Sequence, residues 1–134
     1  MTRYVIDASA AVEYLLRTTT GRHVADLIQG ADILAPMLID VEVLSALRRL
    51  TLAGILAVDR ADEAIADLSQ WPIQRTEHTA LLHEAWGLRN NVNAYDALYV
   101  AAARLYEAVL LTADGPLARM PVQGITVHNI SSPE

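Results

Sequence analysis

The chain has 134 residues and is 53% hydrophobic, which predicts one folded domain with its own core rather than a disordered chain. Sixteen acidic residues outnumber ten basic ones, and the formal charge of −6 argues against nonspecific binding to nucleic acid. All ten basic residues are arginine and there is no cysteine, which excludes a Walker phosphate-binding loop, a Schiff-base lysine, a disulfide framework and a thiolate metal site.

The predicted elements are short apolar runs that alternate with longer stretches of helical periodicity. In chain order they are strand 4–6, helix 8–16, helix 23–28, strand 33–35, helix 36–53, helix 60–69, strand 72–73, helix 81–86, helix 94–106, strand 108–112 and strand 125–127. Gly54 is expected to end the third helix, Asp59 to cap the fourth, and a loop with Pro121 to lead to the last strand. This alternation predicts a three-layer α/β/α domain around a parallel sheet of four to five short strands.

The chain shows no targeting or membrane segment. No apolar run approaches the roughly eighteen residues that a membrane span needs, and Asp7 and Glu13 interrupt the stretch where a signal peptide is apolar. We therefore expect residues 1–134 to form a single domain that is cytoplasmic and makes no use of a membrane.

Four acidic side chains are expected at the carboxyl edge of the predicted sheet. Asp7 directly follows the first strand, and Asp114 lies two residues beyond strand 108–112. A crossover helix runs antiparallel to the strands, so its first turns lie at the level of the same edge. That rule adds Asp96, near the start of helix 94–106, and Glu42, one to two turns into helix 36–53.

Three of these acids also have a purely structural interpretation. Asp7 is suited to cap the first helix, and Asp96 stands three residues after Asn93, close to the spacing of a capping box. Asp114 followed by glycine and proline is also typical of an ordinary turn.

Glu42 is harder to explain structurally, because its neighbours on the helix are mostly apolar. Asp40 lies about 200° away round the same helix, so only one of the two can point inward. Periodicity alone does not choose between them.

Carboxylates packed together repel one another, and a divalent cation removes the conflict. Oxygen ligands without cysteine or a nearby histidine suit a hard ion, Mg²⁺ or Mn²⁺. Such an ion polarises a phosphoryl oxygen and lowers the pKa of a bound water, so phosphodiester hydrolysis is the reaction that this site favours.

The acids lie in four segments: VIDASA at residues 5–10, LIDVEVLSALRR at 38–49, NAYDALYVAAA at 93–103 and LLTAD at 110–114. In this order and at this spacing they resemble the PIN-domain ribonucleases, particularly the VapC-type toxins of toxin–antitoxin systems. The resemblance implies a Mg²⁺- or Mn²⁺-dependent endoribonuclease with RNA as substrate. It also implies inhibition by a VapB-type antitoxin and assembly into a homodimer.

By position in these motifs, the family's catalytic and metal-binding acids correspond to Asp7, Glu42, Asp96 and Asp114, which favours Glu42 over Asp40. Ser9 and Thr112 match hydroxyl positions that flank the site. Some PIN domains carry a further acid just beyond the position of Asp114, and residues 115–119 contain none. One metal is therefore expected to bind firmly, with a second arriving with RNA.

Two other functions were weighed. A haloacid-dehalogenase-type phosphatase is disfavoured because Asp-Ala-Ser at residues 7–9 replaces the Asp-x-Asp pair and because no lysine can clamp a phosphate. The stronger alternative is a catalytically inactive PIN-fold module that binds RNA or protein, against which the retention of all four acids argues.

Other residues carry weaker expectations. Tyr99 lies one turn after Asp96 on a similar face, which leaves an approach to RNA open, but a half-buried core position is the favoured expectation. Trp71 and Trp86 are expected in the core or a dimer contact, and the four histidines at the surface. Arg48 and Arg49 extend the helix of Glu42 and are placed to reach phosphate, although solvated surface explains them as well.

Overall fold

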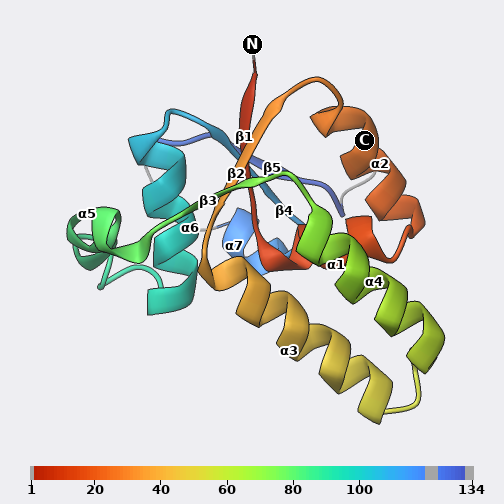
Figure 1. The fold of residues 1–134 in the computed structure, drawn as a ribbon. Coiled ribbons are helices and arrows are strands. Elements are labelled where there is room, and N and C mark those ends of the chain that lie inside the picture. Colours follow the sequence, from red (N-terminus) through yellow and green to blue (C-terminus); the bar gives the residue numbers. More distant parts are fainter. Residues whose placement is uncertain (1, 120–123, 132–134) are drawn as a thin grey trace.

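A five-stranded parallel sheet runs through the middle of the protein in the computed structural model, which describes residues 2–119 and 124–131 (Figure 1). Its strands lie in the order β3-β2-β1-β4-β5. They are β1 (Arg3–Ile6), β2 (Asp32–Pro36), β3 (Gln74–Thr76), β4 (Val109–Thr112) and β5 (Val127–Asn129). The central strand β1 pairs in parallel with both β2 and β4, since Val5 lies opposite Leu34 on one side and Leu110 on the other.

Helices cover both faces of the sheet (Figure 1). They are α1 (Ala8–Leu15), α2 (Thr19–Ile28), α3 (Leu38–Leu52), α4 (Val58–Gln70), α5 (Leu82–Trp86), α6 (Ala94–Leu105) and the short α7 (Gly115–Ala118), with a 3₁₀ turn at His78–Ala80. Side chains of β1 alternate between the two faces, so Ile6 packs with α1 to α4 and Val5 packs with α6. The predicted three-layer α/β/α architecture is confirmed.

Caps determine where the helices near the carboxyl edge begin. The Asp7 carboxylate accepts from the Ala10 N–H at 2.9 Å and starts α1, and the Asn93 side chain accepts from the Asp96 N–H at 2.8 Å and starts α6. Helices α1 and α2 approach closely at Gly21, where a Cβ atom would lie 1.9 Å from a backbone oxygen of α1. That contact requires glycine and holds α2 against α1.

The predicted starts of three helices were wrong. Helix α2 begins at Thr19 rather than at residue 23, because the Thr18 hydroxyl caps it. Asp59 is not the cap of α4. Ala57 occupies that position. Asp59 lies in the first turn, where its negative charge interacts favourably with the positive end of the helix dipole. Helix α3 begins at Leu38, since Pro36 still belongs to β2.

The remaining differences concern β3, β5 and the segment before β5. Strand β3 covers residues 74–76 instead of 72–73, because it pairs with the end of β2, where Leu34 lies opposite Gln74. Strand β5 is displaced from 125–127 to 127–129. Part of the predicted loop forms α7, and Pro121 lies outside the described residues. Within residues 2–119 and 124–131, no helix has the length and hydropathy to span a bilayer.

Candidate active site

The carboxyl ends of β1 and β4 lie side by side and carry two of the four predicted acids. Ile6 lies opposite Leu111 in the sheet, and the Asp7 N–H donates to the Leu111 carbonyl at 3.1 Å. Asp7 is therefore the residue at the end of β1, and Asp114 follows β4 at the start of α7. Parallel pairing brings together two segments that are more than a hundred residues apart.

Two hydroxyl groups connect these strand ends. The Ser9 hydroxyl donates to Asp7 Oδ1 at 2.7 Å and accepts from the Ala113 N–H at 2.9 Å. The Thr112 hydroxyl accepts from the Asp114 N–H at 2.9 Å and lies 3.3 Å from Ser9 Oγ. This network fixes the Asp7 carboxylate relative to the backbone around Asp114.

The two acids of α3 point to different neighbours. Asp40 forms a two-pronged ion pair with Arg75, with Nε to Oδ2 at 2.8 Å and Nη2 to Oδ1 at 3.0 Å. Glu42 accepts a hydrogen bond from the Tyr99 hydroxyl at 2.7 Å, across to α6. Since α6 also carries Asp96, only Glu42 is joined to the helix of another predicted acid.

Asp96 lies in the first turn of α6 and is half-buried. Its backbone N–H is capped by Asn93, whose side-chain amide also donates to Asp96 Oδ2 at 3.3 Å. The capping interpretation of this spacing therefore holds. It leaves the Asp96 carboxylate with only this one long hydrogen bond to the described residues.

Burial raises the pKa values of Asp7, Asp96 and Glu42, and the charges of neighbouring acids raise them further. Burial raises the pKa of Asp7 to about 6 against the lowering effect of its hydrogen bonds, and the charge of Asp114 adds to the rise. Burial also raises the pKa of Asp96, and Asp114 is again the charge responsible for part of the shift. The pKa of Glu42 is raised by burial and by the charge of Asp96, while the Tyr99 hydrogen bond lowers it.

Mutual repulsion thus links Asp7 to Asp114, Asp114 to Asp96, and Asp96 to Glu42. We call these four residues the acid cluster. Tyr99, beside it, is 1% exposed, and its pKa is raised above the usual range by burial and by Glu42, so it stays a hydrogen-bond donor.

The acid cluster has the donor chemistry of a hard divalent cation. Its ligands are carboxylate oxygens, and a cation would relieve the desolvation and repulsion that raise the pKa of Asp7. Among the described residues, no three histidine, aspartate or glutamate side chains lie close enough together to hold a metal ion as they stand. The cluster therefore fits such an ion by chemistry and charge, and the carboxylates must converge to enclose it.

A hollow of about 460 Å³ lies beside the acid cluster, between α1 and α3. Ser9 and Glu42 line it, and so does Arg49, further along α3. We call it the α1–α3 groove. Its lining includes Glu42, a residue of the acid cluster.

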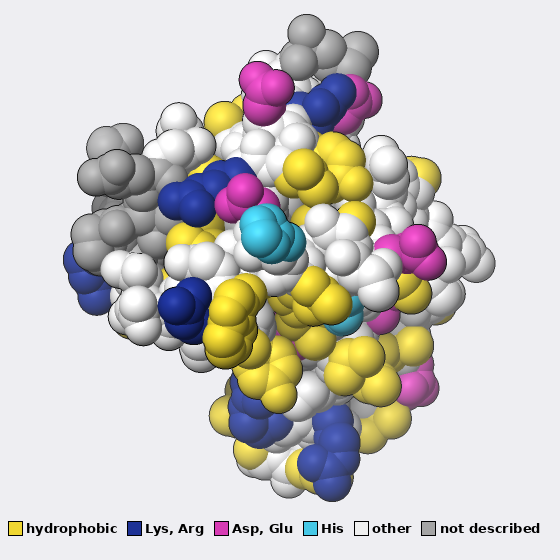
Figure 2. All heavy atoms as spheres, turned by 90° about the vertical axis from the view of Figure 1, so that its left-hand side faces the viewer, with side chains coloured by type: hydrophobic (Ala, Val, Ile, Leu, Met, Phe, Trp, Pro, Cys, Tyr) yellow, Lys and Arg dark blue, Asp and Glu magenta, His cyan; other side chains and the backbone are white. Residues whose placement is uncertain are grey.

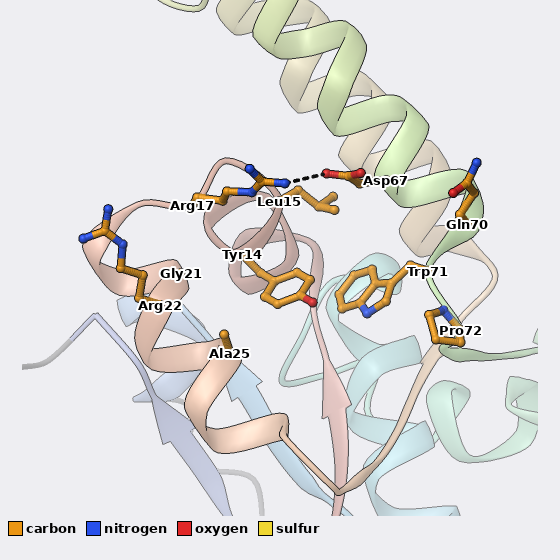
Figure 3. Close-up of a pocket in the computed structure, with 10 residues that line it drawn as sticks. All are labelled: Tyr14, Leu15, Arg17, Gly21, Arg22, Ala25, Asp67, Gln70, Trp71 and Pro72. Carbon is orange, nitrogen blue, oxygen red and sulfur yellow. Dashed lines mark ion pairs between the residues drawn. The ribbon is translucent and has the colours of Figure 1, made fainter.

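Another hollow of about 460 Å³ lies between α1, α2 and α4 and has no residue of the acid cluster in its lining (Figure 3). Tyr14 and Trp71 stack inside it, with ring centroids 4.8 Å apart and planes at 18°. Arg17 pairs across its mouth with Asp67 at 3.5 Å (Figure 3). These contacts tie α1 and the turn after it to α4, and the hollow is not the candidate active site.

The sequence from residue 4 to residue 123 matches the family model of the PIN domain. Ribonuclease VapC3 of Mycobacterium tuberculosis is 42% identical over 116 residues, which are 86% of this chain and 85% of that protein. The chain is a PIN-domain protein of the VapC family. A second relative, Ribonuclease VapC1 of the same organism, is 37% identical over 123 residues, covering 90% of this chain and 92% of that protein.

Solved structures support the PIN fold. A chain in the crystal structure of VapBC2 from Rickettsia felis bound to a DNA fragment from their promoter matches with a TM-score of 0.68 and 12% identity, covering 95% of this chain and 98% of that one. PAE2754 from Pyrobaculum aerophilum matches with a TM-score of 0.66 and 22% identity, covering 94% of this chain and 83% of that one.

Sequence reasoning missed several contacts around the site. Tyr99 was expected in the core, on the same helix face as Asp96, and it is buried, but its hydrogen bond to Glu42 was not anticipated. His78 was expected at the surface, but it is half-buried and its Nε2 accepts from the Leu38 N–H at 2.9 Å, which caps α3. Trp71 is in the core as expected, at 8% exposed. Trp86 is not in the core, at 68% exposed and with Arg89 4.9 Å from its ring centre, so a dimer contact stays the prediction for it.

Proposed function

We propose that this protein is a divalent-metal-dependent endoribonuclease, the toxin of a type II toxin–antitoxin pair, and that it hydrolyses RNA at the acid cluster. The observation that carries the proposal is the meeting of four acids from four segments at one edge of a PIN-domain sheet. Relatives named as ribonucleases support the reaction class. A catalytically inactive binding module is the alternative that the experiment below excludes or establishes.

In this proposal Asp7, Asp96 and Asp114 hold Mg²⁺ or Mn²⁺, with Glu42 as a further ligand or as the group that orients the attacking water. The ion, when bound, polarises the phosphoryl oxygen and neutralises charge on the phosphate. Ser9 and Ala10 keep the Asp7 carboxylate in one orientation, and Tyr99 does the same for Glu42. The water oxygen bonds to phosphorus, the bond to the 3′ oxygen breaks, and that oxygen takes up a proton. The products carry a 5′-phosphate and a 3′-hydroxyl.

We also propose a VapB-type antitoxin and a second copy of the chain as protein partners. The support comes from the family and from structural neighbours in the VapBC2 structure from Rickettsia felis and the VapBC structure from Salmonella typhimurium. Exposed apolar side chains spread over the side of the molecule that carries α5 (Figure 2), and Val41 and Leu44 of α3 are 62% and 54% exposed. Such a surface suits a protein partner.

Substituting Asp7 tests the enzymatic function. We expect the purified protein to cleave mixed RNA with Mg²⁺, EDTA to stop the reaction, and Asp7→Asn to slow it by about a hundredfold or more. Asparagine keeps the side-chain oxygen that caps α1 but loses the charge, so the fold should persist. Gel electrophoresis measures the cleavage, and ligation assays identify the product ends.

Asp59→Asn is the matched control, because Asp59 is an exposed acid at the start of α4. It should cleave like the unmodified protein. Equal activity of the unmodified protein and Asp7→Asn would leave the binding module as the better function. Products ending in 2′,3′-cyclic phosphate would overturn the hydrolytic mechanism.

A further inference from the structure

We propose that Arg49 binds a phosphate of the RNA strand next to the one that is cleaved, so that the substrate runs along the α1–α3 groove. This inference rests on the proposed function and adds to it a residue that positions the substrate. Arg49 makes no contact with the reacting atoms in this scheme. It holds the strand in register with the acid cluster.

The groove extends directly from the acid cluster to Arg49. Glu42 and Arg49 are seven residues apart on α3, so they lie on the same helix face, about 10 Å apart along the axis. Ser45 and Ala46 form the floor between them, and Ser9 of α1 lies on the facing wall. Because these side chains are small, the space between the two helices stays open to a strand.

Charge selects which part of the groove can receive a phosphate. Glu42 and Glu13 both line it and repel phosphate, and the Glu13 carboxylate is held by the Thr18 hydroxyl at 2.6 Å. Arg49 is the single cation among the described residues that line the groove. A phosphate beyond the cleavage site is therefore stabilised only at the Arg49 end.

The Arg49 guanidinium is available for this contact. It is exposed, and within the described part of the chain no ion pair or side-chain hydrogen bond holds it, whereas Arg17, Arg60 and Arg75 pair with acids. Basic side chains stand at the lower edge of the face in Figure 2, where α3 descends. The planar fork of arginine binds phosphate through two parallel hydrogen bonds. Since the chain has no lysine, a side-chain cation that contacts phosphate must be an arginine.

Arg48 provides the matched control. It is exposed on the same helix, next to Arg49 in sequence, and does not line the groove, since successive residues point about 100° apart. Substituting either arginine removes one positive charge from the same part of the molecule. Only Arg49→Gln should alter the path of the RNA.

The experiment measures binding and cleavage separately. A fluorescent single-stranded RNA is titrated with protein in EDTA at several salt concentrations, so that no cleavage occurs. We expect Arg49→Gln to weaken binding about tenfold and to reduce the slope of log K against log salt by about 0.7, the loss of one phosphate contact on a single strand. Arg48→Gln should leave the slope unchanged, and Arg49→Lys should retain it because it keeps the charge. In Mg²⁺, Arg49→Gln should raise KM with little change in kcat.

The outcomes separate this inference from the proposed function. If the unmodified protein cleaves RNA and Arg49→Gln matches Arg48→Gln in salt slope and KM, the Arg49 inference is overturned. The proposed ribonuclease activity stands in that case. If no cleavage occurs but binding in EDTA still depends on Arg49 and not on Arg48, the RNA contact stands and the ribonuclease is overturned. Matching circular dichroism and Tm values show that each variant is folded.

Discussion

At the scale of single residues, Asp7 combines two functions that the sequence presented as alternatives. Its Oδ1 caps α1, and the same carboxylate stands in the acid cluster. It is 4% exposed, so the charged form is desolvated, and hydrogen bonds from Ser9 and Ala10 compensate only partly. A residue that we propose as a metal ligand therefore destabilises the metal-free fold when it is ionised.

The cost of burying the Asp7 charge predicts that the protein and its Asp7→Asn variant differ in unfolding free energy by an amount that changes with pH, when both are measured in EDTA. The folded-state pKa of Asp7, about 6, exceeds its ordinary value of 3.8, so between these pH values the folded chain holds a proton that the unfolded chain has released. The contribution of the protonated Asp7 side chain to the unfolding free energy is complete below pH 3.8 and is lost as the pH rises through 6. Asp7→Asn should therefore gain about 3 kcal/mol of unfolding free energy relative to the unmodified protein between pH 4 and pH 7.

Urea unfolding at a series of pH values measures this difference. A difference between the two proteins that stays constant from pH 4 to pH 7 would contradict burial of the Asp7 charge. The asparagine side chain can still accept from the Ala10 N–H, so loss of the α1 cap does not mask the effect.

At the scale of elements, the two acids of α3, Asp40 and Glu42, contact different parts of the molecule. Asp40 pairs with Arg75, which also donates to the Leu68 and Trp71 carbonyls at 2.9 and 3.2 Å and so ties α3 to the end of α4. Glu42 faces the other way, toward Tyr99 of α6. The helix is therefore anchored through Asp40 on one side and carries the proposed catalytic residue Glu42 on the other.

Matched substitutions on α3 test this division. Asp40→Asn should lower the unfolding free energy by about 1 kcal/mol, a modest value because the pair is partly exposed, and should leave RNA cleavage intact. Glu42→Gln should slow cleavage strongly and leave stability nearly unchanged. Urea unfolding and cleavage rates report the two effects, and the reverse pattern would assign the site to Asp40.

At the scale of the whole molecule, the negative charge is concentrated. The acid cluster holds four of the sixteen acids, and the remaining twelve face ten arginines, so the rest of the chain carries only −2. Binding of two divalent ions would change the total from −6 to −2. In the proposed function, the acidity that argued against RNA is the condition for metal binding, and a bound metal would make the same edge attractive to phosphate.

Magnesium should therefore stabilise the folded protein. At a concentration about a hundred times its Kd, Mg²⁺ should add about 2.7 kcal/mol of unfolding free energy, a rise of several degrees in Tm. Asp114→Asn should reduce this shift, because it removes a proposed ligand. Thermal unfolding with NaCl at matched ionic strength separates binding from screening, and equal shifts in both proteins would place the metal elsewhere.

The architecture and the edge of the sheet that carries the chemistry could be predicted from sequence because both follow from local rules. Apolar periodicity distinguishes strand from helix, and the alternation of the two implies parallel strands whose carboxyl ends share one edge. Asp7 and Asp114 could be placed there because each directly follows a strand. Starts of helices were less accurate, as at α2 and α4, because caps such as Thr18 compete with equally good candidates nearby.

The sequence by itself determined the fold class and the parallel sheet, and it placed Asp7, Asp96 and Asp114 near one edge, since these depend on patterns within a few consecutive residues. The choice of Glu42 over Asp40 came from the resemblance to the PIN-domain family. Only the tertiary structure decided that Asp40 forms an ion pair with Arg75 and that Glu42 accepts a hydrogen bond from Tyr99. It also decided that Arg49 lines the same groove as Glu42. Those contacts join residues 35 and 57 positions apart, or lie between separate helices. They depend on how helices pack and which way side chains turn, and no local pattern specifies either.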